Sequence, residues 1–310
     1  MKLKKMLILA FLAYAVFTSA CVYIVLPEGL EAPKAVDPGA KPKDWSGFVT
    51  NVVTSDAGDL RIDIVIRNET GEWSTMRAVD DKAALLTSSD GKTSNCSTVF
   101  VSTGGHRLAP GFQMRGYTTG KKADQTTQLL YVECADVTQA DGAKLTIDYV
   151  SFQGELDDYK PEANKITGKL ELNLNEVATD LTFPVAEVVD GLIMDSGVGI
   201  TGLSDNVVTL LDAQRTDTGF EFTWQNFNPT KFALKTHIGT PPIIGADGVI
   251  YGTYETLDMV SVPLTPAAEN MQWTTEVIAP QDVTGFYILL SVESKKPRTY
   301  LNYAIDISDK

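Results

Sequence analysis

Cys96 and Cys134 are two residues of this 310-residue chain that could form a covalent link with each other. The third cysteine, Cys21, lies in a hydrophobic N-terminal leader, so the remaining two form an even set. A chain exported by such a leader reaches a compartment in which disulfides persist. We therefore expect a Cys96–Cys134 disulfide, and the alternative is a pair of buried free thiols.

Ser102 and His106 could pair as a nucleophile and its base. They lie at a Gly-rich stretch, 103–107, that lacks a strand-to-helix elbow and an evident third catalytic member, so an ordinary loop is the better interpretation. The other histidine, His237, is far away in sequence, and neither a phosphate-binding loop nor a zinc-ligand cluster occurs. We expect no catalytic residue, no cofactor and no metal. Paired carboxylates for glycoside hydrolysis stay open, because their separation depends on the fold.

Acidic residues outnumber basic ones, and the net charge is −14. Such a surface repels phosphate backbones and anionic headgroups, so we expect no nucleic-acid partner. Solubility explains the charge more simply than cation binding does, since no acidic pair has the spacing of a calcium loop. The pairs that could offer oxygen ligands are Asp56 with Asp59, Asp80 with Asp81, and Asp157 with Asp158.

Three aromatic residues and two asparagines supply further candidate sites. Trp73, Trp273 and Tyr251 could form a platform for a sugar, although aromatic side chains in sandwich folds more often fill the core. Two tripeptides match the N-glycosylation pattern, which matters only in a host that glycosylates asparagine. They are Asn68-Glu69-Thr70 and Asn95-Cys96-Ser97.

Residues 1–26 form a targeting or anchoring segment, with three lysines before an uncharged run from Met6 to Leu26. The sequence Phe-Thr-Ser-Ala-Cys that ends at Cys21 resembles the lipobox of bacterial lipoproteins, and the resemblance implies lipid attachment at Cys21. Thr18 stands where leucine is usual, and apolar residues follow the cysteine. An uncleaved membrane span over Met6 to Leu26 and simple cleavage with release are therefore alternatives. Lysines before the apolar run place the body of the protein outside the cytoplasm.

Alternating apolar and polar residues predict strands along much of the remaining chain. In Asp59–Thr70 the even positions from Leu60 to Ile66 are apolar, Val65 is an exception, and the strand ends at an Asn-X-Thr corner. Gly219–Thr230 repeats the pattern with Phe220, Phe222 and Trp224. Each strand has one apolar face that a second sheet must cover, which predicts β-sandwiches.

The length suits two sandwiches of about 100 residues each with connecting segments. We expect a Pro-containing tether at 27–44, a first sandwich at 45–180 and a second at 181–310. The strand Ile166–Val177 could complete the first sandwich or begin the second. Turns are predicted at Asp90-Gly91 and Asp247-Gly248. Hairpins are predicted from 128–135 with 144–152 through Asp141-Gly142, and from 286–294 with 299–307.

The order of features in the first unit recurs in the second at a nearly constant offset, which predicts a duplicated domain. The matched positions are Leu60 with Phe220, Asp90-Gly91 with Asp247-Gly248, Met114 with Met271, and Val132-Glu133 with Val292-Glu293.

With Trp224 on an inner face, this strand pattern and its Asn-X-Thr corner resemble the immunoglobulin-like sandwiches, including telokin-like ones, of anchored prokaryotic surface proteins. The resemblance implies two tandem immunoglobulin-like domains and a role in display or binding, and it identifies no functional residue. We therefore expect a membrane-anchored extracytoplasmic binding or scaffolding protein without catalytic activity, whose ligand is an unknown protein or glycan. The alternative is a secreted carbohydrate-binding or carbohydrate-active protein.

Overall fold

The described part of the chain consists entirely of β-strands and their connections, so the all-β prediction is confirmed. In this computed structural model those strands belong to one compact unit, 39–310. The predicted leader and Cys21 lie outside the described residues, and within these no helix is long and apolar enough to cross a membrane. The structure describes residues 44–54, 58–119, 126–137, 140–153, 165–181, 183, 193–195, 199–201, 207–227, 234–238, 241–252, 260–264, 271–293 and 300–309.

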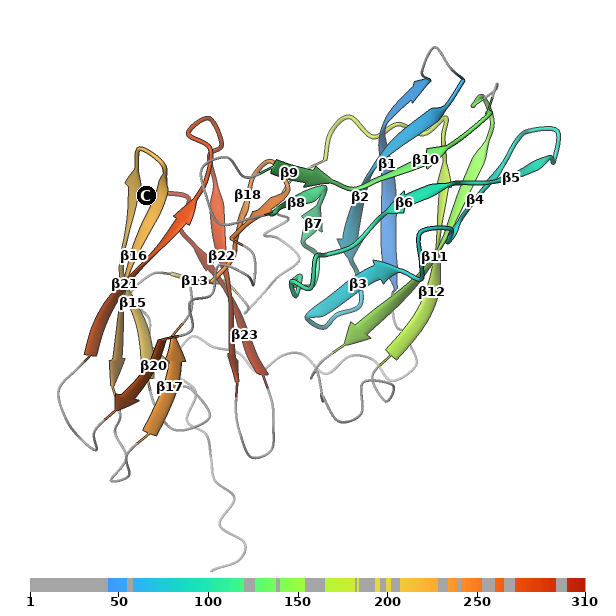
Figure 1. Ribbon diagram of the computed structural model, residues 1–310. Helices are drawn as coiled ribbons and strands as arrows, with labels where there is room; N and C mark the ends of the chain where they lie inside the picture. Colours follow the sequence, from blue (N-terminus) through green and yellow to red (C-terminus); the bar gives the residue numbers. More distant parts are fainter. Residues whose placement is uncertain are drawn as a thin grey trace, which may run out of the picture. The chain divides into compact units, whose positions relative to one another are not determined.

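Sheet A forms one layer of the first sandwich, with the strand order β1-β2-β10-β6 (Figure 1). The predicted alternation in β2 is confirmed, because its side chains from Leu60 to Ile66 at even positions are fully buried. Val65 is buried as well, on the opposite face. The strands are β1 (Trp45–Thr54), β2 (Leu60–Asn68), β10 (Tyr131–Cys134) and β6 (Thr98–Phe100), and β7 (Gln113–Met114) pairs with the end of β2.

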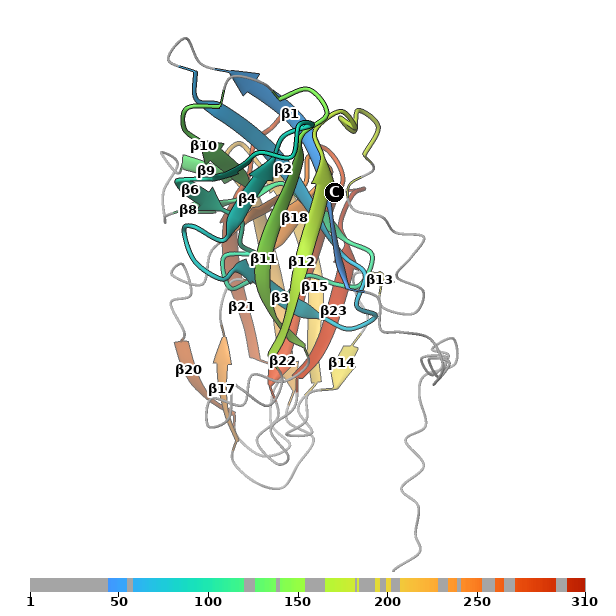
Figure 2. The same ribbon diagram turned by 90° about the vertical axis from the view of Figure 1, so that its right-hand side faces the viewer.

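Sheet B forms the facing layer, with the strand order β12-β11-β4-β5, and β3 pairs with β11. Strand β12 pairs with β11 in register from Lys165 to Asn173, and the two lie side by side in Figure 2. Leu170 and Leu172 of β12 join the core shared with sheet A. The strand that the sequence left unassigned therefore completes the first sandwich. The strands are β3 (Ser74–Ala78), β4 (Ala84–Thr87), β5 (Thr93–Asn95), β11 (Lys144–Gln153) and β12 (Lys165–Asn173).

The hairpin predicted around Asp141-Gly142 is wrong. Gly142 does adopt a positive φ of 68°, as a tight turn requires, but the strands on either side do not pair. Strand β10 pairs with β2 and β6 in sheet A, whereas β11 pairs with β12, β3 and β4 in sheet B. The turn thus carries the chain from one sheet to the other. A turn signal marks a reversal of direction and does not specify which strand accepts the hydrogen bonds.

Sheets C and D enclose a second core. Sheet D pairs β15 with β16 and β16 with β21, and Phe220, Phe222 and Trp224 of β16 are buried as predicted. The predicted hairpin of β22 and β23 in sheet C is confirmed. Sheet D consists of β14 (Gly199–Thr201), β15 (Val207–Thr216), β16 (Gly219–Phe227) and β21 (Met271–Ile278), and β17 (Leu234–Ile238) pairs with β20 (Val260–Leu264) in a separate sheet.

Sheet C contains strands from both sides of the boundary expected at 180/181. Its order is β13-β23-β22-β18-β19-β8-β9, and β8 pairs with β19 in parallel. Ile243 of β18 belongs to the second core, whereas the next residue, Ile244, belongs to the first. Both faces of β18 are therefore buried, one against each core. The strands are β8 (Gly116–Thr119), β9 (Thr126–Leu129), β13 (Ile193–Asp195), β18 (Ile243–Gly245), β19 (Val249–Tyr251), β22 (Phe286–Glu293) and β23 (Tyr300–Asp306).

Asn68 holds the predicted corner at the end of β2. Its side chain is fully buried, and its Nδ2 donates to the carbonyl oxygens of Glu72 (2.8 Å) and Leu108 (2.7 Å). Its Oδ1 accepts hydrogen bonds from the backbone N–H (3.0 Å) and the hydroxyl (2.7 Å) of Thr70. The amide thus uses both its donors and both its acceptor sites. This tripeptide is a structural corner, and the similar corner expected at 228–230 lies outside the described residues.

We predict that Asn68→Ala lowers the free energy of unfolding by about 3 kcal/mol, because it leaves buried backbone groups without partners. Asn95 belongs to the other glycosylation-type tripeptide and is exposed on β5, so Asn95→Ala is the matched control and changes stability by less than about 0.5 kcal/mol. Urea unfolding followed by circular dichroism measures both. Equal stability of the two variants contradicts the structural role of Asn68.

Candidate functional site

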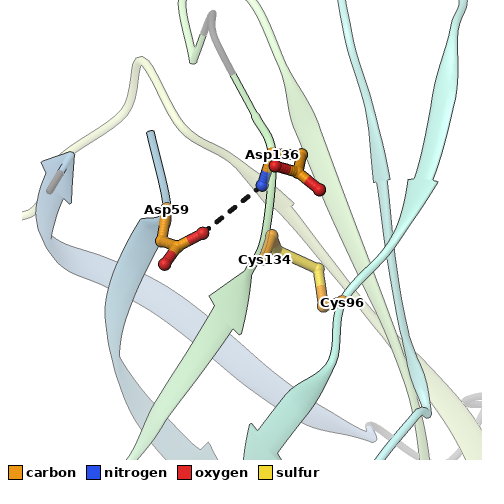
Figure 3. Close-up of a disulfide and its surroundings, with 4 residues drawn as sticks. All are labelled: Asp59, Cys96, Cys134 and Asp136. Atoms are coloured by element: carbon orange, nitrogen blue, oxygen red, sulfur yellow. Dashed lines mark hydrogen bonds between the residues drawn. A yellow bond between two sulfur atoms is a disulfide. The ribbon is translucent and has the colours of Figure 1, made fainter. Parts of the chain in front are cut away.

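The predicted disulfide between Cys96 and Cys134 is confirmed, with an S–S distance of 2.02 Å (Figure 3). Both cysteines are buried, and the bond links the residues next to β6 and at the end of β10, two neighbouring strands of sheet A. Beside it, the backbone N–H of Asp136 donates to Asp59 Oδ1 at 3.4 Å (Figure 3). The bridge therefore fastens β6, which pairs with β10 over only three residues.

We predict that replacing both cysteines by alanine lowers the free energy of unfolding by about 3 kcal/mol, because the bridge closes a separation of 38 residues in the unfolded chain. Urea unfolding of the variant and of the parent, each with and without reductant, measures the difference. Thiol labelling of the unfolded, unreduced parent gives an independent check. Labelling of Cys96 and Cys134 there would show that the bridge does not form in the protein as isolated.

His106 lies in a buried loop and not in an open catalytic cleft. Only 1% of its surface is exposed, and burial lowers its pKa to about 4. Its ring lies edge-on to Tyr117, with 6.3 Å between the ring centroids. Gly104 has a φ of 64°, and a Cβ there would meet the Tyr117 ring at 2.9 Å, so the loop needs glycine for both conformation and space. The loop interpretation of this stretch is favoured by that packing. Ser102 Oγ accepts the Gly104 N–H at 3.1 Å.

The buried imidazole predicts a specific dependence of stability on pH. The unfolded chain binds a proton at His106 near pH 6.5, whereas the folded protein does so only near pH 4. The unfolded state therefore binds more protons between these values, and folded stability falls as the pH drops through this window, by up to about 3 kcal/mol.

Denaturant unfolding at several pH values tests this expectation. His106→Gln removes this part of the slope between pH 6.5 and pH 4, because glutamine does not titrate. His237→Gln is the matched control and keeps the contribution of His106 to the slope. Carboxylates titrate in the same range, but they contribute alike to all three proteins. An unchanged slope in His106→Gln would contradict the assignment.

The proposed sugar platform does not form, because its members pack in cores. Trp73 and Tyr251 are 6% and 3% exposed and belong to two different cores. Trp273 is partly buried against the second core, opposite Trp224 on the neighbouring strand. Trp224 itself is buried and donates from Nε1 to Thr275 Oγ1 at 2.9 Å. The core interpretation of these aromatic residues is therefore confirmed.

The acidic pairs do not converge where the structure describes them. Asp59 accepts the Asp136 N–H, and Asp80 accepts the N–H of Lys82 at 2.8 Å. Asp56, Asp157 and Asp158 lie outside the described residues. Within the described ranges, no cluster of three or more histidine, cysteine, aspartate or glutamate residues could hold a metal ion.

A hollow of about 500 Å³ lies over sheet B, between the end of β3 and the start of β4. Its polar lining includes Asp80, Lys82, Asp148 and Lys169. Lys169 Nζ already pairs with Asp148 Oδ1 at 2.8 Å, and both side chains are largely exposed. An open hollow with an internal ion pair offers little shelter from water, and so it is a weak candidate for a binding site.

Four side chains form a continuous row across the outer face of sheet A and the adjacent β8, and we call Arg61, Tyr131, Phe100 and Tyr117 the aromatic row. The Arg61 guanidinium lies 4.3 Å from the centre of the Tyr131 ring. The ring centroids of Tyr131 and Phe100 are 5.8 Å apart, and those of Phe100 and Tyr117 are 5.9 Å apart. The interplanar angles are 24° for the stacked Tyr131–Phe100 pair and 33° for the tilted Phe100–Tyr117 pair.

Strand alternation places Arg61, Tyr131 and Phe100 on the outer face, whereas Tyr117 is partly buried against the first core. Val132 and Val99 point into the core, so the adjacent Tyr131 and Phe100, which pair across β10 and β6, point away from it. All four side chains of the row are only partly buried. Burial raises the pKa of the Tyr117 hydroxyl above its usual value, so this group stays neutral and can donate a hydrogen bond at physiological pH.

Polar groups adjoin the Arg61 end of the aromatic row. Asp63 accepts hydrogen bonds from Arg61 Nε at 2.8 Å and from Asn51 Nδ2 at 3.2 Å. Glu133 lies opposite Arg61 on the neighbouring strand. The surface thus combines apolar rings with fixed donors and acceptors, which suits noncovalent binding. Sequence reasoning missed it, although aromatic residues at the polar-facing positions of strands were an available signal.

A search of protein-family models and a search of curated proteins each find no match to this chain.

Proposed function

We propose that this chain is a membrane-anchored extracytoplasmic binding or scaffolding protein without catalytic activity, and that the outer face of sheet A is its binding face. The aromatic row is the observation that carries the proposal. Partly exposed aromatic side chains and arginine are the residues that contribute most to binding surfaces. On an ordinary protein surface apolar residues are scattered singly, whereas here three rings and one arginine form a contiguous group.

The disulfide supports the extracytoplasmic location. Disulfides persist in oxidising compartments and are rare in the cytosol. Cys96 and Cys134 are buried and joined, so their pairing is a stable feature of the fold and not a transient surface contact. The leader, with Cys21 at the lipobox-like sequence or the apolar run as a span, supplies the proposed attachment to the membrane.

A tandem pair of immunoglobulin-like sandwiches is the proposed architecture. Two hairpins support a duplication, because β1–β2 shifts register between Val49 and Asn51 and β15–β16 does so between Leu210 and Asp212. Met114 and Met271 also lie opposite the corresponding ends of β2 and β16. The match of Val132 with Val292 is weaker support for a duplication. Val132 lies on β10, which pairs with β2. Val292 lies on β22, which pairs with β18 and β23 of sheet C, whereas β16, the counterpart of β2, belongs to sheet D.

We predict that the protein sediments with membranes and that its N-terminus is modified at Cys21. Mass spectrometry of the N-terminal peptide distinguishes a lipidated Cys21 from an intact leader, which would be the membrane span. Cys21→Ser separates the same alternatives. In a lipoprotein this change blocks lipidation and processing at residue 21, whereas it leaves a membrane span in place. Cys96 and Cys134 are unaffected by that change, so the disulfide serves as an internal control for correct folding.

A soluble mature chain that begins near Cys21 or later would refute the anchor. That result would favour the second candidate, a secreted carbohydrate-binding protein. The same aromatic row supports the second candidate, because its rings and its polar end combine apolar and hydrogen-bonding surface.

A further inference from the structure

Contacts within the fold position the side chains of the aromatic row in the absence of a ligand. Arg61 is fixed from two sides, by the Tyr131 ring and by Asp63. Tyr131 and Phe100 are direct neighbours on paired strands, and the disulfide fastens those same two strands. A ligand would therefore not have to order these side chains at a cost in conformational entropy.

The charges near the row restrict the class of ligand. Asp63 and Glu133 accompany the single arginine, and the whole chain carries a net charge of −14. Single-stranded nucleic acid also stacks on aromatic rings, but it requires a positively charged groove that follows its backbone. Polyanionic glycans meet the same repulsion. The surface therefore disfavours an anionic ligand.

The arrangement of rings and polar groups narrows the class further. Proline-rich peptides dock in grooves between aromatic side chains. Here the three rings are in successive contact across β10, β6 and β8, with Phe100 stacked on Tyr131 and tilted against Tyr117. A pyranose ring has apolar C–H surfaces and a rim of hydroxyl groups. Its C–H surfaces match the exposed parts of the rings, and its hydroxyls match the N–H donors of Arg61 and the carboxylate oxygens of Asp63 and Glu133.

We propose that the aromatic row binds a neutral pyranose glycan, an assignment of ligand class that rests on the proposed binding function. Tyr131 and Phe100 supply the central contact. Arg61 and Asp63 orient the sugar by hydrogen bonds at one end, and Tyr117 extends the contact at the other. Binding is noncovalent, and no bond of the glycan is broken.

Isothermal titration calorimetry of the full chain in detergent micelles tests the proposal. The probes are neutral oligosaccharides of glucose, mannose, xylose and N-acetylglucosamine, with an acidic uronic-acid oligosaccharide and a proline-rich peptide for comparison. Tyr131→Leu and Phe100→Leu remove a ring and keep an apolar side chain, so they leave the core positions unchanged. Tyr131→Phe keeps the ring. Leu85→Ala, at an exposed site on β4 of sheet B, is the matched control.

We expect at least one neutral oligosaccharide to bind and its affinity to fall about tenfold or more in Tyr131→Leu and Phe100→Leu. Tyr131→Phe and Leu85→Ala keep the parental affinity. Melting temperatures and the state of the disulfide confirm that each variant is folded, and Asp63→Asn, which preserves the size of the side chain, gives a second test that spares the rings.

The contrary outcomes separate the ligand class from the proposed function. Binding of only the peptide, lost in Tyr131→Leu, overturns the glycan and leaves the binding face in place. Glycan affinity that none of the row variants changes overturns the site. Failure of every neutral oligosaccharide overturns the ligand class, whereas release of the chain from membranes, measured separately, overturns only the anchored function.

Discussion

Burial of alternating side chains between sheets A and B is the interaction on which the first sandwich depends. Each fully buried leucine or isoleucine contributes about 1.5 to 3 kcal/mol, and β2 alone supplies four of them at even positions from Leu60 to Ile66. The opposite positions of the same strands must then face outward. Arg61 and Asp63 lie on the outer face for this reason. The core and the candidate binding face are therefore two results of one periodicity.

In sheet C, two strands bury side chains on both of their faces. Ile243 and Ile244 are adjacent in β18 and point into different cores, and Tyr287 and Ile288 do so in β22. Phe112, from the buried loop after His106, packs edge-on against Tyr287 with 5.5 Å between centroids. A strand buried on both faces cannot leave either core without exposing apolar surface to water. Because of this coupling, the described strands belong to one compact unit.

The position of an aromatic side chain relative to its sheet decides its role in this protein. Trp73 and Tyr251 are buried in cores, whereas Tyr131 and Phe100 are on an outer face and remain partly exposed. Large aromatic residues are chemically suited to either role. The row also needs Tyr117, which comes from β8 and is brought beside Phe100 although the two are not neighbours in sequence.

The sequence by itself determined the features that depend on local geometry. Alternation predicted the buried faces of β2 and β16, and the Asp-Gly pairs predicted turns that do place Gly91 and Gly248 at positive φ. The even number of cysteines outside the leader predicted the Cys96–Cys134 bridge. Each of these signals spans a few residues or follows from a count, so no knowledge of distant contacts was needed.

Only the tertiary structure decided which strands pair and which faces meet. The partners of β10 and β11, the position of β12 in sheet B, and the hydrogen bond from Asn68 Nδ2 to the Leu108 carbonyl all join residues through contacts that no local period encodes. The alternation of a strand specifies that one face is buried and leaves open what covers it. The aromatic row depends on that missing information, because its members come from four strands that become neighbours only when the sheets assemble.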